Sequence, residues 1–159
     1  MSECVGCHLI ERRDLGEAPP WDSVVRFRNW DVVHAYGTSL PGWLVVIPRQ
    51  HRDSVADLTD DEAAELGPLV KATSAALSDV VGCVKTYVVQ FAEAAGHQHV
   101  HVHVIPRQPD QPPELKGPRI FALLGVAPED EVTPERMDEI ALAVSAFLDE
   151  HPPVGVAPV

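Results

Sequence analysis

The chain has 159 residues, of which 24 are acidic and 12 basic, and its formal charge at neutral pH is -12. This length suits one domain with a buried core, which we place at residues 1–150, and the aperiodic residues 151–159 are expected to form a disordered tail. The negative charge argues against a surface for nucleic acid or anionic lipid, and no apolar run approaches the ~20 residues of a membrane span. We therefore expect neither a nucleic acid nor a membrane as a partner.

The first residues, MSECVGCHLIERRD, contain no basic leader followed by an apolar stretch, and the sequence therefore predicts a cytoplasmic protein. In that reducing environment Cys4, Cys7 and Cys83 should remain thiols. The Cys4-x-x-Cys7 pair is then a candidate for metal binding or redox chemistry.

Strand patterns come first along the chain. Three short β-rich runs are expected to share one sheet, namely residues 24–28, 30–36 and 43–47. A capping-box spacing that begins at Thr59, followed by apolar residues at helical intervals, predicts a helix over residues 60–80. Pro68 lies inside this pattern and predicts a kink or a late start of the helix.

The second half of the chain alternates between strand, loop and helix patterns. Runs rich in valine and aromatic residues at 84–92 and 99–105, joined by the short segment 93–98, predict two adjacent antiparallel strands. Residues 106–118 contain five prolines and should form an irregular surface loop that covers a site. Thr133 as N-cap, Pro134 at the first helical position and the apolar face that follows predict a helix over 133–150. Because no regular βαβ alternation is present, we predict an α+β fold with a mostly antiparallel sheet.

Four histidines fall within seven residues of the last predicted strand, and three of them alternate strictly with valine: His97, His99, His101 and His103. On a strand these side chains would project from one face at intervals of roughly 6.5–7 Å. Two uses of such a row compete. One is a metal site with two or three histidine ligands, and the other is nucleotidyl chemistry with one histidine as the nucleophile.

The run His99-Val100-His101-Val102-His103-Val104-Ile105 has the pattern His-φ-His-φ-His-φ-φ, where φ is apolar, and Pro106-Arg107 continues it. This pattern resembles the histidine triad (HIT) family. The run from Val46 to His51 is similar to the family's apolar-Pro-x-x-His segment, and the resemblance extends over residues 4–107. It implies a HIT-like fold with a five-stranded antiparallel sheet and two helices, in a homodimer with a continuous ten-stranded sheet.

The resemblance also implies an activity. Family members hydrolyse or transfer nucleoside monophosphates from phosphoramidates, acyl adenylates or dinucleoside polyphosphates through a covalent nucleotidyl-histidine intermediate. Carried over to this chain, His101 would be the nucleophile that attacks phosphorus. His103 would hydrogen-bond a phosphate oxygen or the leaving group, most effectively in its protonated form.

The residues around the motif are candidates for substrate binding. Gln98 is placed to approach the phosphate, His97 to lie at the edge of the site, and Arg107 continues the motif. The acid and the histidine that many family members carry before the third strand are missing from the segment Ala35–Trp43. Gln90 is a candidate to replace the polar contacts that this change removes from ribose recognition.

A zinc-binding subgroup of the family resembles this chain in a second set of residues. A cysteine pair near the N-terminus, a histidine after the third strand and the first motif histidine correspond here to Cys4, Cys7, His51 and His99. Zinc favours four tetrahedral nitrogen and sulfur ligands, and a full set leaves no open position. The resemblance therefore implies a structural zinc.

Two other classes of function stay open at the level of sequence. One is a zinc-stabilised nucleotide-binding or adaptor protein with little catalysis. The other is a redox or hydrolytic metalloenzyme whose metal is held by His99, His101 and His103.

Overall fold

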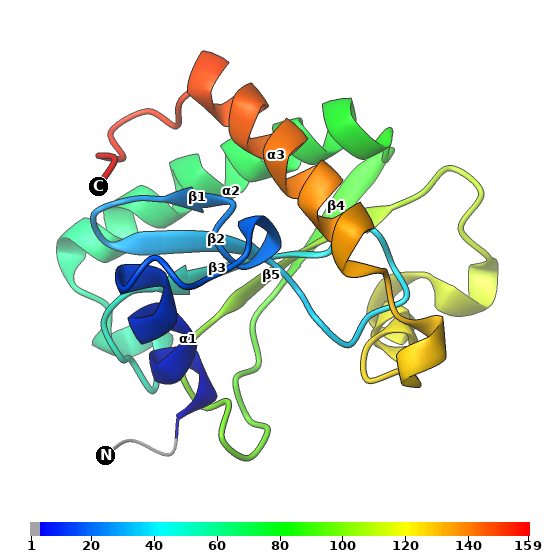
Figure 1. Cartoon of the computed structure of the whole chain (residues 1–159), viewed down its shortest axis with the longest axis horizontal. Helices are drawn as coiled ribbons and strands as arrows, with labels where there is room; N and C mark the ends of the chain where they lie inside the picture. Colours follow the sequence, from blue (N-terminus) through cyan, green and yellow to red (C-terminus); the bar gives the residue numbers. More distant parts are fainter. Residues whose placement is uncertain (1–3) are drawn as a thin grey trace.

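One antiparallel sheet of five strands forms the centre of the computed structural model, which describes residues 4–159 (Figure 1). The strands are β1 (Val25–Arg26), β2 (Trp30–His34), β3 (Leu44–Pro48), β4 (Lys85–Val89) and β5 (Val102–Arg107). Their spatial order is β1-β2-β3-β5-β4, and every neighbouring pair is antiparallel. The predicted α+β class and the five-stranded antiparallel sheet are confirmed, and so is the adjacency of the last two strands.

Both predicted helices are present, as α2 (Asp60–Val81) and α3 (Pro134–Glu150). The capping box of α2 is complete, because the Thr59 side chain accepts from the Glu62 N–H and the Glu62 carboxylate accepts from the Thr59 N–H. The helix therefore begins at Asp60, well before Pro68, and the alternative of a late start is wrong.

A third helix, α1 (Val5–Asp14), lies ahead of the sheet and was not predicted. Its cap is unusual, because the Cys4 thiol takes the place of the hydroxyl or carboxylate that normally accepts from the first turn. Its buried positions include a glycine and an arginine besides Ile10, so that no apolar stripe marks it in the sequence.

The two faces of the sheet have different coverings. On one face α2 and α3 pack side by side over alternating residues of the central strands, and the main core contains Val32, Val46, Val102, Val104, Leu69, Leu77 and Val144. On the other face a smaller apolar cluster around Trp43 and Ile105 is covered by the 3-10 helix η4 (Gly117–Leu123). Four more 3-10 turns lie in the described chain: η1 (Pro20–Asp22), η2 (Val55–Asp57), η3 (Pro113–Leu115) and η5 (Pro128–Asp130).

The strand that carries the histidine motif is shorter than predicted. β4 ends at Val89 and β5 begins at Val102, so that the connection runs from 90 to 101 rather than from 93 to 98. Ahead of β5, the Val100 N–H donates to the Arg52 carbonyl at 2.7 Å, in the segment that follows β3, instead of to a strand of the sheet. The predicted single row of four histidines is therefore wrong, since only His103 lies within β5.

The end of the chain also differs from the expected disordered tail. Residues 151–159 return to the edge of β1, where the Arg28 N–H donates to the Ala157 carbonyl at 2.8 Å and Phe27 bridges to Pro158. Val156 is buried in the main core. Backbone pairing with a sheet edge requires no periodic side-chain pattern, which explains why composition suggested disorder.

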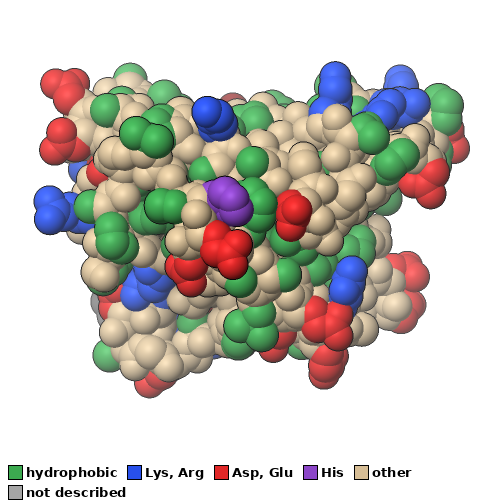
Figure 2. Space-filling view, turned by 90° about the horizontal axis from the view of Figure 1, so that it is seen from above, with side chains coloured by type: hydrophobic (Ala, Val, Ile, Leu, Met, Phe, Trp, Pro, Cys, Tyr) green, Lys and Arg blue, Asp and Glu red, His purple; other side chains and the backbone are tan. Residues whose placement is uncertain are grey.

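The surface carries charged side chains of both signs, as the composition of the sequence leads one to expect. Figure 2 shows one face on which acidic, basic and hydrophobic side chains are interspersed, without a continuous basic patch. Among residues 4–159, no helix combines the length and the apolar character that crossing a bilayer requires.

Candidate functional site

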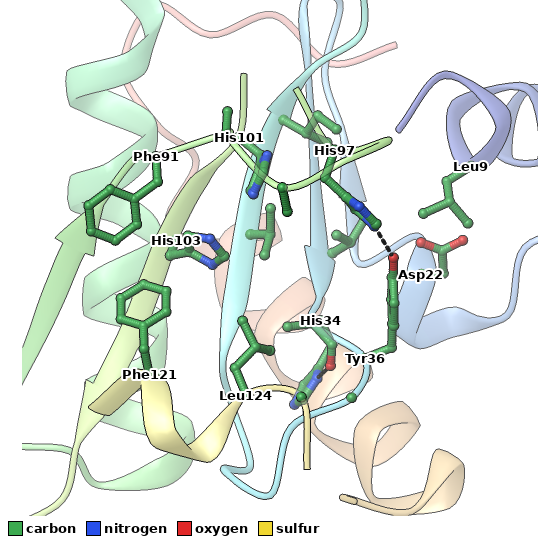
Figure 3. A pocket seen from close by; sticks show the side chains of 18 of the residues that line it. Leu9, Asp22, His34, Tyr36, Phe91, His97, His101, His103, Phe121 and Leu124 are labelled. Atoms are coloured by element: carbon green, nitrogen blue, oxygen red, sulfur yellow. Dashed lines mark hydrogen bonds between the residues drawn. The ribbon is translucent and has the colours of Figure 1, made fainter. Parts of the chain in front are cut away.

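The second and third motif histidines, His101 and His103, face a cavity of about 570 Å³ on the sheet face opposite α2 (Figure 3). The walls come from α1, β2, β3, the 90–101 connection and the segment around η4. They are mostly apolar and include Leu9, Val33, Val45, Ile47, Phe91 and Leu124. The register of the sheet places His103 opposite Val45 of β3, and both side chains line the cavity.

The hydrogen bonds of the two histidines assign their ring protons. Nδ1 of His101 lies 2.7 Å from the His99 carbonyl oxygen, which can only accept, so that Nδ1 carries the proton and Nε2 keeps its lone pair. Nδ1 of His103 lies 3.0 Å from the indole nitrogen of Trp43, which can only donate, so that His103 carries its proton on Nε2. One ring therefore presents a base or nucleophile and the other a donor.

Burial keeps both rings neutral at physiological pH. Desolvation lowers the pKa of His101 below its usual 6.5, and desolvation together with the neighbouring His101 lowers the pKa of His103 to about 4. Without a substrate, the His103 ring is therefore neutral, and it supplies an N–H donor without the protonation that was expected to make it most effective.

Aromatic side chains hold the His103 ring in place. Phe121 from η4 lies edge-on to both His103 and Trp43, with ring centroids 5.3 Å apart in each pair. Phe91 contacts Phe121 from the other side at 5.4 Å. The segment directly after the predicted loop 106–118 thus places one side chain against His103.

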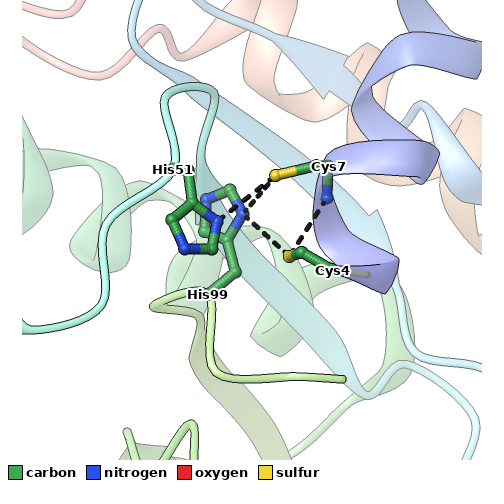
Figure 4. Close-up of side chains that lie close together, drawn as sticks. All are labelled: Cys4, Cys7, His51 and His99. Carbon is green, nitrogen blue, oxygen red and sulfur yellow. Dashed lines mark hydrogen bonds between the residues drawn. The ribbon is translucent and has the colours of Figure 1, made fainter. Parts of the chain in front are cut away.

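A second cluster joins α1 to the start of the motif (Figure 4). One ligand atom from each of Cys4, Cys7, His51 and His99 lies within 4.8 Å of the others. The Cys7 sulfur is 3.3 Å from Nδ1 of His51 and 3.7 Å from Nδ1 of His99, and the Cys4 sulfur is 3.8 Å from the latter. The structure therefore brings together all four residues that the sequence assigned to a metal.

The spacing of this cluster fits a tetrahedral zinc. Nitrogen and sulfur ligands at about 2.0–2.3 Å from a zinc ion stand roughly 3.3–3.8 Å from each other, which is the range of the three sulfur–nitrogen distances given above. Each histidine also has an acceptor behind it, because Nε2 of His99 donates to the Pro48 carbonyl at 2.8 Å and Nε2 of His51 to Asp53 at 2.9 Å. Such outer partners leave Nδ1 as the ligand atom.

Close packing at the helix start belongs to the same cluster. Gly6 lies between the two cysteines, and a Cβ atom there would stand 3.1 Å from Nδ1 of His99 and 3.2 Å from a methyl carbon of Ile47. The absence of a side chain lets α1 approach the motif closely enough for both thiols to reach the histidines.

The three motif histidines do not form a common metal site. Within residues 4–159, the only group of three or more metal-binding side chains is the Cys4, Cys7, His51 and His99 cluster. His99 belongs to that cluster, whereas His101 and His103 turn toward the cavity. This geometry speaks against the alternative of a metalloenzyme with a three-histidine centre.

The remaining predicted site residues have different places. His97 lines the cavity, and its Nε2 accepts from the Tyr36 hydroxyl at 3.0 Å. Gln98 is exposed, and neither it nor Gln90 nor Arg107 is among the lining residues. Arg107 pairs with Lys85 at the far end of β5.

Sequence reasoning missed the part of the cavity that precedes the motif. Tyr36, Leu9 and the buried pair Arg13 and Asp22 all line it, and each lies in a segment without a recognisable pattern. Arg13 is the one Lys or Arg among the described lining residues, and it is bonded to Asp22 at 2.7 Å. The only sequence signals in this region were the β-rich run at 30–36 and the acid missing from the segment Ala35–Trp43.

Comparisons with known proteins agree with this geometry. A HIT domain family model matches residues 23–110. The chain belongs to the HIT family. No curated protein sequence matches it.

Solved structures of HIT proteins share the fold of this chain. A zinc-bound histidine triad family protein from Mycobacterium smegmatis has 19% identity and a TM-score of 0.64, with 93% of this chain and 96% of that chain covered. A hypothetical histidine triad nucleotide-binding protein from Sulfolobus tokodaii has 18% identity and a TM-score of 0.67, with coverage of 91% and 93%. A Hit-like protein from Bartonella henselae, described as involved in cell-cycle regulation, has 21% identity and a TM-score of 0.63, with coverage of 86% and 93%.

Proposed function

We propose that this HIT protein is a nucleotidyl hydrolase or transferase that cleaves a nucleoside monophosphate from a phosphoramidate, an acyl adenylate or a dinucleoside polyphosphate. The observation that carries the proposal is the opposite tautomers of two adjacent rings at one cavity. His101 presents an unprotonated Nε2, and His103 presents an Nε2–H, because their Nδ1 atoms are bonded to a carbonyl and to an indole N–H respectively.

The reaction follows from these two nitrogens. Nε2 of His101 forms a bond to phosphorus while the bond to the leaving group breaks, and the leaving group takes a proton from water. Attack places a positive charge on the His101 ring, which its Nδ1–H shares with the His99 carbonyl at 2.7 Å. The Nε2–H of His103 donates a hydrogen bond to a phosphate oxygen, where negative charge is concentrated. Water or another acceptor then attacks phosphorus and releases the nucleotide and the neutral His101.

We also propose a structural zinc held by Cys4, Cys7, His51 and His99. A closed set of four ligands supplies no reactive position, so that the ion would tie α1 to the motif strand and take no part in the chemistry. His99 links the two sites, since its ring belongs to the cluster and its carbonyl orients His101.

The finer assignments belong to the same proposal. His97 contacts the substrate at the cavity edge. Parts of the substrate that extend out of the cavity contact Gln90, Gln98 and Arg107. We further propose a cytoplasmic homodimer. The open edge of β4, next to the half-exposed Val84 and Val88, supports an extended sheet as its interface.

The test is replacement of the nucleophile. His101→Gln should lower the release of AMP from adenosine 5′-phosphoramidate by at least about 10³-fold, because the substituted side chain forms no covalent intermediate. The control is His151→Gln, at an exposed histidine outside the cavity, which should retain activity within about twofold.

The outcome also separates the enzyme from the adaptor class. Acid-quenched wild-type protein incubated with labelled substrate should carry nucleotide on His101, detected by mass spectrometry of peptides. A wild-type protein that binds AMP but releases none from any of the three substrate classes, and that carries no nucleotide, would be an adaptor.

A further inference from the structure

Asp22 carries an oxygen atom that the structure leaves without a partner. The residue ends η1, is 1% exposed and lines the same cavity as His101 and His103. One carboxylate oxygen, Oδ1, accepts from Nη2 of Arg13 at 2.7 Å. The other, Oδ2, is buried and has no hydrogen-bond partner.

The ion pair with Arg13 does not account for this oxygen. An arginine often binds both oxygens of a carboxylate. Here Nε of Arg13 donates instead to the Asp22 backbone carbonyl at 2.6 Å, and Nη1 donates to Asp31 at 3.4 Å. The donors of Arg13 are thus shared between the backbone and a second acid, and Oδ2 is left open. Burial raises the pKa of the Asp22 carboxyl in spite of the nearby Arg13, which shows how poorly the group is solvated.

The charges around Asp22 indicate which kind of donor fits. The ion-pair network at this end of α1 consists of three arginines and three aspartates, namely Arg13, Arg26 and Arg49 with Asp14, Asp22 and Asp31. Its formal charges therefore cancel. A cationic ligand finds no net attraction there, whereas a neutral hydroxyl would complete the hydrogen bonding of Oδ2.

We propose that Oδ2 of Asp22 accepts a hydrogen bond from a sugar hydroxyl of the nucleotide substrate, which makes Asp22 a specificity-determining residue of this site. The inference rests on the proposed function, because a phosphorus atom at His101 places the attached sugar in the cavity that Asp22 also lines. A sugar carries vicinal hydroxyls, and these are the neutral donors nearest to the phosphate of a nucleotide.

Tyr36 is the side chain that moves to admit the sugar. Figure 3 shows its phenol end beside the Asp22 carboxylate, and the Asp22 charge contributes to a raised pKa of Tyr36, after the larger effect of burial. The Tyr36 side chain is 46% exposed, and its hydroxyl donates to His97 at the cavity edge. A rotation of this ring opens the path to Oδ2 without any change in the buried Arg13 pair.

The experiment compares Asp22→Asn with Asp31→Asn by calorimetric titration. Asn at position 22 keeps an oxygen for Arg13 and replaces Oδ2 by an NH2 group, which cannot accept. Asp31 is equally buried and bonds the same arginine, but it does not line the cavity, which makes it the matched control. The ligands are the four common ribonucleoside 5′-monophosphates and their 2′-deoxy, 3′-deoxy and 2′,3′-dideoxy counterparts.

In the wild type, removal of the hydroxyls should weaken binding by about tenfold or more, as expected for a hydrogen bond to a charged group. Asp22→Asn should weaken ribonucleotide binding to the same degree and should change the affinity for the dideoxy ligand by less than about twofold. Asp31→Asn should keep the ribose preference. The monodeoxy ligands identify the hydroxyl concerned.

Equal weakening of ribo and dideoxy ligands by Asp22→Asn overturns the proposal, as does a wild type that binds both equally well. The comparison of ribo and dideoxy ligands on the wild-type protein needs no variant, and it decides the question even where Asp22→Asn fails to fold. Failure of the proposed function looks different: nucleotide release and the His101 adduct are then missing while the hydroxyl-dependent affinity of the wild type persists.

Discussion

His99 and His101 are two residues apart, and their side chains have opposite roles. In both rings a backbone carbonyl fixes the position of the proton. The Pro48 carbonyl accepts from Nε2 of His99, and the His99 carbonyl accepts from Nδ1 of His101. The nitrogen that remains is Nδ1 in the first ring and Nε2 in the second. The first faces two thiols and a second imidazole, and the other faces an apolar cavity. The position of a carbonyl, rather than the residue type, separates the proposed zinc ligand from the proposed nucleophile.

The largest expected effect concerns the closed cluster. Cys7→Ser should abolish the binding of one equivalent of zinc and destabilise the fold by about 4 kcal/mol, the stabilisation expected at a zinc concentration near a thousand times its Kd. Elemental analysis and thermal unfolding measure both. Cys83→Ser is the control, because that buried cysteine lies outside the cluster and its loss should leave the zinc in place. Loss of zinc from His101→Gln would contradict the separation of the two sites.

The next prediction concerns the donor tautomer of His103. Trp43→Phe removes the indole N–H that bonds Nδ1, so that the ring proton is no longer held on Nε2, and kcat should fall by about 100-fold with little change in KM. Trp30→Phe is a close control: Trp30 is equally buried and its indole donates to the Glu62 carbonyl on the other face of the sheet. It should lower stability but leave kcat within about threefold. Equal losses of kcat in both variants would mean that Trp43 contributes to catalysis only through packing.

A smaller effect tests the approach of α1 to the motif. Gly6→Ala should weaken zinc binding by about tenfold, because the added methyl group meets the His99 ring at 3.1 Å, and a displaced ligand typically costs that much affinity. Competition with a chromophoric chelator measures it. Gly67→Ala in α2 is the control: nothing lies within 4 Å of the added carbon, and helix propensity should raise stability by about 1 kcal/mol. An unchanged zinc affinity in Gly6→Ala would show that the cluster does not depend on this contact.

The features of the fold that local sequence patterns encode were predicted correctly. The alternation of valine and histidine placed Val102 and Val104 in the core and His103 on the opposite face, and the capping box fixed the start of α2. The four cluster residues were found through resemblance to a family, since nothing in their spacing alone relates Cys4 to His99 across 95 positions.

The parts that failed depend on contacts between distant segments. Just before the strand start at Val102, Val100 bonds to Arg52, which is far away in the sequence, and α1 is held by a cysteine cap and a buried arginine rather than by an apolar stripe. The Asp22 wall of the cavity has no motif at all. The neutral state of the His103 ring could not be predicted from the sequence, because burial, which lowers its pKa to about 4, is a property of the folded chain.

The pH dependence of the rate is the smallest expected effect, and it follows from this last point. His101 must be unprotonated to attack, and its pKa lies below 6.5, so that more than half of the rings remain active at pH 6.5 and the rate should fall less than about twofold from pH 7.5. Once the pH falls below the pKa of His101, the rate should decline about tenfold per pH unit, with the slope of a single proton, because His103 with a pKa of about 4 stays largely neutral down to pH 5. Initial rates of nucleotide release between pH 5 and 8, with zinc content measured at each pH, test this. A rate that rises as the pH falls from 7.5 to 6 would mean that a protonated His103 is the working form, and the donor tautomer set by Trp43 would then not explain catalysis.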